Sequence, residues 1–212
     1  LPGALGYNEF LKRYDYDPAA AEKILDEAGW KRNDRGIRQK GSQQLTFTFA
    51  YVDEPISRAL AERIVAHWRV IGAQVEGRAI TASQIQKDII RPRAYEALLF
   101  SVVGGDADPF PLWHSSQSDD PGLNLSSIKV REIDALLEIG RRTFDPTARA
   151  QTYLEFQKKL RETIPTILLH STPYTYAISS KVHGLTRQTL STPADRLTGI
   201  EKWFVRSRLG WR

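Results

Sequence analysis

Apolar residues recur every three or four positions in five stretches of the chain, a spacing that predicts amphipathic helices. The predicted helices cover residues 18–28, 55–71, 82–90, 129–143 and 146–164. Asp17 and Asp145 are good N-cap residues, and each precedes a proline at the first helical position. In the helix that begins at Pro55, we expect five residues to form the buried stripe: Ile56, Leu60, Ile64, Trp68 and Ile71.

Other stretches show the period of a β-strand. Apolar and polar residues alternate in residues 45–51 and 73–79, on either side of the helix at 55–71. This order predicts a right-handed βαβ unit with parallel strands. Residues 95–103 are nearly all apolar, as in a strand covered on both faces. With shorter strands expected at 166–170 and 174–179, the pattern predicts an α/β fold with a mainly parallel sheet flanked by helices.

A loop rich in glycine and aspartate, GGDADP at residues 104–109, follows the apolar strand. Ligands of α/β sheets bind outside the carboxyl ends of strands, so this loop is the first place to look for a site. Its Asp106 and Asp108 allow three readings. Asp108 can initiate a turn before Pro109, the aspartates can contact a polar ligand, or the pair can do acid–base work. A calcium loop is not predicted, because it needs more oxygen ligands at regular spacing.

Trp113 and His114 follow this loop, and their rings suit stacking on a ligand, although a tryptophan can equally close the edge of a core. No enzyme signature accompanies them. The chain has no cysteine, its four histidines lack metal-ligand spacing, and it has neither a Gly-x-Ser-x-Gly turn nor a glycine-rich phosphate loop. The residues alone therefore favour a binding module over an enzyme that uses the two aspartates.

Charge adds little to this picture. The 30 Lys and Arg residues exceed the 25 Asp and Glu residues, giving a formal net charge of +5, but the signs are mixed along most of the chain. A basic and aromatic tail at residues 202–212 offers an alternative, the binding of single-stranded nucleic acid. The longest apolar run, 97–103, is too short to span a membrane. Because the chain starts at Leu1, we expect a processed chain or a piece of a longer one.

Several short motifs occur in a fixed order. Residues 16–30, YDPAAAEKILDEAGW, are followed by WRVIGAQV at 68–75. Further segments are LTFTF at 45–49, GGDADP at 104–109, WHSSQ at 113–117, IDALL at 133–137 and IPTI at 164–167. Together they resemble the peptide- and nickel-type extracytoplasmic solute-binding proteins of bacterial ABC importers. The first two are similar to the family patterns Y-D-P-x-x-A-x-x-L-L-x-E-A-G and W-x-x-I-G-(I/V)-x-V, and the resemblance covers about residues 1–184.

The resemblance implies a C-terminal lobe of the periplasmic-binding-protein type II kind. Members of the family have two lobes that close on a ligand, so residues 1–170 would form one α/β ligand-binding lobe. Residues 171–212 would be the return segment that crosses back to the missing N-terminal lobe. The weak periodicity after Gly184 fits that role, and we expect an exposed apolar face or edge there.

The resemblance also implies a function without catalysis. The protein would capture a small solute, by default a di- or oligopeptide, and deliver it to a membrane ABC permease. It would work in the periplasm or, lipid-anchored, at the outer face of the cell membrane. A nickel complex or another small solute such as a sugar is the alternative ligand. No cofactor, bound metal or nucleic-acid partner is expected.

In peptide binders of the family, an aspartate just after the strand that matches residues 95–103 holds the amino terminus of the ligand, a role for Asp106 or Asp108. The tryptophan common near the start of that loop is Val103 here, and Trp113 is expected to take over part of its stacking role. The ligand contacts that we expect are Asp106, Asp108, Trp113, His114, Asn124 and Tyr51.

Overall fold

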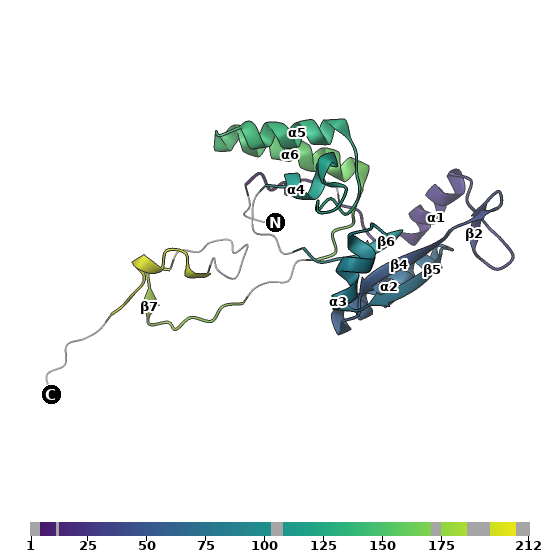
Figure 1. Cartoon of the computed structure of the whole chain (residues 1–212), viewed down its shortest axis with the longest axis horizontal. Helices are drawn as coiled ribbons and strands as arrows, with labels where there is room; N and C mark the ends of the chain where they lie inside the picture. Colours follow the sequence, from purple (N-terminus) through teal and green to yellow (C-terminus); the bar gives the residue numbers. More distant parts are fainter. Residues whose placement is uncertain (1–4, 12, 103–107, 171–174, 186–195, 207–212) are drawn as a thin grey trace. The chain divides into compact units, whose positions relative to one another are not determined.

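The computed structural model describes residues 5–11, 13–102, 108–170, 175–185 and 196–206. These residues belong to two units. Figure 1 labels their main helices and strands. The sheet unit comprises Lys12–Ser101 and Ser116–Ser127, and the helical unit comprises Leu1–Leu11, Val102–Ser115 and Ile128–Arg212. Each unit has a hydrophobic core of its own.

The sheet unit contains the predicted strand, helix and strand. Its elements are α1 (Pro18–Glu27), β1 (Lys31–Arg32), β2 (Arg38–Lys40), β3 (Gln43–Gln44), β4 (Thr46–Val52), α2 (Pro55–Val70), β5 (Gln74–Ile80), α3 (Ala82–Gln84) with a π-helical extension (Ile85–Ile90), and β6 (Ala97–Leu99). One sheet has the order β5, β4, β6, and β4 is parallel to both neighbours. The predicted parallel pairing is therefore confirmed.

Strand β4 is covered on both faces, because alternate side chains of a strand point to opposite sides. Phe49 and Tyr51 pack into a cluster with residues of α2 and β5: Ala61, Val65, Ala73 and Val75. Ala50 packs into a second cluster with three isoleucines of the π-helical extension: Ile85, Ile89 and Ile90. The two clusters fix which side chains of β4 face α2 and which face the extension.

The buried stripe of α2 differs from the predicted one. Its fully buried residues are Ala61 and Val65, whereas Ile56 is 73% exposed. Ile64 and Trp68 pack at the margin of the cluster. Small side chains at the centre of the contact let the helix approach the sheet closely, and hydrophobicity along the sequence does not reveal that preference.

The strand predicted over residues 95–103 is shorter than expected. β6 has three residues, all of them half-buried, and the side chains of Phe100 and Val102 beyond it are exposed. Among the described residues, β6 has β4 as its one strand neighbour and so lies at an edge of the sheet. The expected cover on both faces is confirmed for the strand itself, because Ala97 and Leu99 pack on one core cluster and Leu98 packs on the other. The predicted length is wrong for the described residues, and Val103 lies outside them.

A small antiparallel sheet of β1, β2 and β3 precedes β4, in a stretch that the sequence analysis assigned to no element. Arg38 in β2 is its anchor, with a side chain only 2% exposed. Its guanidinium donates hydrogen bonds to the carbonyl of Ile71 at 2.7 Å, the carbonyl of Trp30 at 2.6 Å and the carboxylate of Asp26 at 2.9 Å. One buried side chain therefore ties together the ends of α1 and α2 and the hairpin between them.

The helical unit is built on a pair of helices. Its elements are α4 (Phe110–Trp113), α5 (Arg131–Arg142), α6 (Pro146–Thr163), β7 (Val182–His183), a 3-10 turn (Ile200–Lys202) and β8 (Phe204–Val205). As predicted, Asp145 caps α6 by accepting a hydrogen bond from the amide of Ala148 at 2.8 Å. Gly140 of α5 lies against the ring of Tyr153, where a Cβ atom would come within 2.4 Å of the ring. The glycine therefore allows the close packing of α5 on α6.

The segment after α6 departs from prediction. No strand forms at residues 166–170, and Ile167, Leu168 and Leu169 are 66%, 83% and 46% exposed. No strand forms at 175–179 either, and Tyr174 lies outside the described residues. An apolar run becomes a strand only beside a partner that accepts and donates its backbone hydrogen bonds, and the described residues supply none here. The described strand pairing beyond residue 170 joins β7 antiparallel to β8.

Across the residues that the structure describes, none of the helices combines the length and the apolar character needed to cross a bilayer.

We predict that Arg38→Ala lowers the free energy of unfolding of the chain by about 3 kcal/mol, because it removes a buried side chain that donates to the carbonyls of Trp30 and Ile71 and to the carboxylate of Asp26. Urea denaturation followed by circular dichroism measures the change. Arg35→Ala, on an exposed residue of the same hairpin, is the control and should change stability by less than about 0.5 kcal/mol. Equal stabilities of the two variants would contradict the anchoring role of Arg38.

Glu96 generates a second prediction, on acid stability. Its carboxylate accepts hydrogen bonds from the amide of Thr48 at 2.7 Å and from the hydroxyl of Thr48 at 2.9 Å, and the amide bond lowers the pKa of Glu96 below its ordinary value of 4.5. A lowered pKa in the folded state means stabilisation that is complete above the unfolded value and is lost as the pH falls through the folded value.

We therefore expect Glu96→Gln to make unfolding less dependent on pH below about 4.5, since the amide oxygen still accepts a hydrogen bond but does not titrate in this range. Denaturation midpoints of the parent and the variant, measured between neutral and acidic pH, provide the check. Parallel pH profiles of the two proteins would exclude a contribution of the Glu96 carboxylate.

Candidate functional site

Asp108 begins the described part of the helical unit after the glycine-rich loop. Its Oδ1 atom accepts a hydrogen bond from the amide of Phe110 at 3.1 Å, so the aspartate holds the turn that enters α4. Its Oδ2 atom accepts from Arg141 of α5, at 2.8 Å from Nε and 2.6 Å from the terminal nitrogen. The carboxylate is only 16% exposed. The turn reading of Asp108 is therefore confirmed, whereas Asp106 lies outside the described residues.

Arg141 also lies over an aromatic ring. Its guanidinium carbon is 3.7 Å from the centroid of the Phe110 ring. The His114 ring stacks on the same phenylalanine, with centroids 4.0 Å apart and planes inclined by 13°. Asp108, Phe110, His114 and Arg141 thus form one cluster on α4 and α5, which we call the aspartate cluster. Arginine over an aromatic face is a favourable arrangement, and here it also orients the guanidinium toward the carboxylate.

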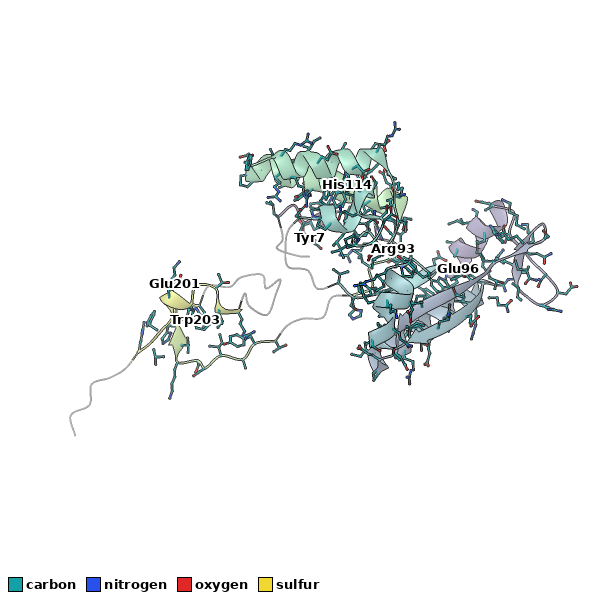
Figure 2. All side chains as sticks on the ribbon, in the orientation of Figure 1. Tyr7, Arg93, Glu96, His114, Glu201 and Trp203 are labelled. Carbon is teal, nitrogen blue, oxygen red and sulfur yellow. The ribbon has the colours of Figure 1, made fainter. Side chains whose placement is uncertain are left out.

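His114 faces two carboxylates of α5. Its Nε2 atom is 3.6 Å from Glu138 and 3.9 Å from Asp134, and the imidazole is 12% exposed (Figure 2). Asp134 also accepts a hydrogen bond from the amide of Ser115 at 2.8 Å. Trp113 is half-buried and packs against the core formed by α5 and α6. Trp113 and His114 were expected from the sequence to stack on a ligand. Among the described contacts, the His114 ring stacks on Phe110 of the same unit.

Tyr51 and Asn124 belong to the other unit. The side chain of Tyr51 is 8% exposed and packs in the core beneath α2, where it also lines a cavity. Asn124 is fully buried, and its Oδ1 atom accepts a hydrogen bond from the hydroxyl of Ser126 at 2.9 Å. The backbone amide of Asn124 donates to the carbonyl of Gln117 at 3.0 Å. The buried Asn124 side chain therefore shapes the loop of residues 116–127.

Arg93 is a residue that the sequence analysis did not identify (Figure 2). Its guanidinium donates to the carbonyls of Ile90, Ser118 and Gly122 at 2.7, 2.8 and 2.6 Å. The nearby Tyr95 donates to the carbonyl of Leu125, and burial raises the pKa of the Tyr95 hydroxyl. Arg93 has a left-handed backbone, with φ of 55°. Neither this conformation nor the bonds to a loop 25 or more residues away can be read from a pattern in the sequence.

The structure thus brings three of the expected contacts together, Asp108, Trp113 and His114, and places Tyr51 and Asn124 in the sheet unit. Within the described ranges, no group of three or more histidine or acidic side chains is arranged to hold a metal ion. The aspartate cluster has a balanced charge, and its described hydrogen bonds and ring contacts are made within the helical unit. The negative charge of Asp108 is balanced by its ion pair with Arg141.

Comparison with solved structures shows the fold. AppA of Bacillus subtilis, an oligopeptide-binding protein solved with a nonapeptide, matches 98% of this chain with a TM-score of 0.73 at 22% identity. NikZ of Campylobacter jejuni, solved with Ni(L-His), matches 93% with a TM-score of 0.71 at 24% identity. The match covers 41% of each of those chains. The predicted class is confirmed: an α/β fold of the type II periplasmic-binding-protein kind, in which the parallel sheet of β5, β4 and β6 is accompanied by helices.

Sequence comparison shows the family. Protein XP55 of Streptomyces lividans is 33% identical over 179 residues, which are 81% of this chain and 32% of that protein. The chain spans about a third of the length of the curated relatives that it matches. Residues 1–124, more than half of the chain, match the family model described as bacterial extracellular solute-binding proteins, family 5 Middle. The chain therefore belongs to the bacterial extracellular solute-binding proteins of family 5.

Proposed function

We propose that the chain is part of the substrate-binding protein of a bacterial ABC importer, which captures a small solute by the closure of two lobes and delivers it to a membrane permease. The family match over residues 1–124 carries this proposal. The protein would act outside the cytoplasm and do no chemistry on its ligand. The oligopeptide-binding relative AppA supports a di- or oligopeptide as the substrate class.

We also propose that residues 1–170 belong to one lobe and that residues 171–212 return toward the other lobe. The exposed Ile167, Leu168 and Leu169 support this division, because three apolar side chains in sequence are poorly placed in water. In the complete protein, the other lobe would cover this segment and supply the backbone partners of a strand.

Within the ligand site, we assign different roles to the two aspartates. Asp108 already accepts from Phe110 and pairs with Arg141, so its charge is balanced inside the helical unit. Asp106 is therefore our choice for the group that holds the amino terminus of a peptide, with Asp108 as the residue that positions the end of the loop. Trp113, His114, Asn124 and Tyr51 stay predicted ligand contacts.

A nickel complex is the second candidate ligand. The observation that favours it is the solved relative NikZ, which holds nickel as a complex with L-histidine. Such a ligand brings donor atoms of its own and requires recognition of a charged, compact shape. A peptide ligand requires in addition an acceptor for its ammonium group, which Asp106 would provide.

The substrate class can be tested by thermal-shift screening of the complete gene product. We expect di- or oligopeptides to raise the melting temperature, since a ligand at 100 times its Kd stabilises the folded state by about 2.7 kcal/mol. N-acetylated peptides are the matched control and should give smaller shifts, because they lack the ammonium group. A shift with nickel–histidine or a sugar, together with none for any peptide, would overturn the peptide assignment.

The positioning role of Asp108 predicts that Arg141→Ala weakens binding of the best peptide about tenfold, equivalent to 1.4 kcal/mol, because the carboxylate loses the partner that holds it. Isothermal titration calorimetry on the complete gene product measures the loss. Arg142→Ala removes a neighbouring arginine that pairs with Glu138 on the surface and should leave the affinity within about twofold. Equal affinities of the two variants would exclude this role for Arg141.

A further inference from the structure

A cavity of about 200 Å³ lies in the sheet unit, lined by Tyr51, Ala61, Glu62, Val65, Arg69 and Gly77. These residues come from β4, α2 and β5. Gly77 makes the room: a Cβ atom there would lie 3.4 Å from the Tyr51 ring and 4.0 Å from Val65. A larger side chain at position 77 would therefore occupy space that the glycine leaves open.

Two opposite charges line this cavity. Glu62 and Arg69 are seven residues apart on α2, nearly two full helical turns, so they lie on the same flank of the helix. The ion pairs of the described residues involve neither side chain. Arg69 makes one long hydrogen bond, 3.5 Å to the carbonyl of Val75. Arg58, another cation of α2, pairs with Asp53 and also has a weaker charge interaction with Glu62.

The spacing of the two charges limits the ligand. Seven residues correspond to an axial rise of about 10 Å, and flexible side chains shorten the gap between the charged groups. An α-amino acid carries its ammonium and carboxylate on one carbon and cannot meet both groups at this separation. A zwitterion whose charges are separated by several methylene groups can do so, and its middle would lie in the space that Gly77 leaves beside Tyr51 and Val65.

We infer that the cavity is a binding site for a short ω-amino acid, with the ligand carboxylate on Arg69, its ammonium on Glu62 and its methylene chain over Gly77, beside Val65 and the ring of Tyr51. The site lies within the sheet unit and requires no second lobe. It is independent of the solute capture proposed for the complete protein.

The test uses this chain and 6-aminohexanoate as the probe, followed by two-dimensional NMR of the backbone amides. We expect saturable shifts around α2 and β5 with a Kd of about 1 mM. Glu62→Gln and Arg69→Gln should each weaken binding about tenfold, and Gly77→Val should abolish it by filling the cavity. Arg63→Gln, an exposed arginine on another flank of α2, is the matched control and should bind as the parent does.

Three results would overturn the inference. The first is the absence of a saturable shift up to about 10 mM probe, and the second is equal binding of the probe by Arg69→Gln and Arg63→Gln. The third is that hexanoate or hexylamine, which carry one charge each, binds as tightly as 6-aminohexanoate. Circular dichroism of every variant shows whether it is folded, and the charge variants lie on the exposed flank, where substitution leaves the core intact. Failure of this test leaves the peptide screen of the complete gene product unaffected, because that screen uses other ligands and both lobes.

Discussion

Strand β4 is the constraint on which the sheet unit depends. It is the central strand of its parallel sheet, with hydrogen-bonded neighbours at both edges and apolar cover on both faces. Its alternation of Phe49, Ala50 and Tyr51 assigns large rings to α2 and a small side chain to the π-helical extension. The Thr48 amide, at the end of the pairing with β6, is satisfied by the Glu96 carboxylate instead of a backbone carbonyl. The cavity beside Tyr51 also follows from the placement of this strand.

The helices were largely predictable because residues close together in the sequence determine where each helix begins. Asp17 and Asp145 each cap a helix whose first residue is proline, and the structure has both bonds. The Asp108–Pro109 turn could be foreseen for the same reason. The hairpin of β1, β2 and β3 could not, because its strands carry polar residues and depend on one buried arginine, Arg38, rather than on a periodic pattern.

The candidate site was predictable in part. Asp108, Trp113 and His114 are close in sequence and lie in one unit, so their proximity required little beyond chain continuity. Arg141 is 33 residues away from Asp108 and Arg93 is 25 residues away from Ser118. Both arginines make hydrogen bonds to residues that are distant in the sequence. The spacing of residues along the chain therefore does not predict these partners. The single sequence therefore identifies polar groups of a site more readily than the cations that hold them.

The exposed segment Ile167, Leu168 and Leu169 has a consequence for how such a protein can be made. A contiguous run of exposed aliphatic side chains tends to associate with other apolar surfaces when no native neighbour covers it. Newly synthesised chain would carry this liability until the remaining polypeptide folds against it. In the two-lobed protein that we propose, carrying both lobes on one polypeptide would keep this segment next to the part that covers it and would limit such association.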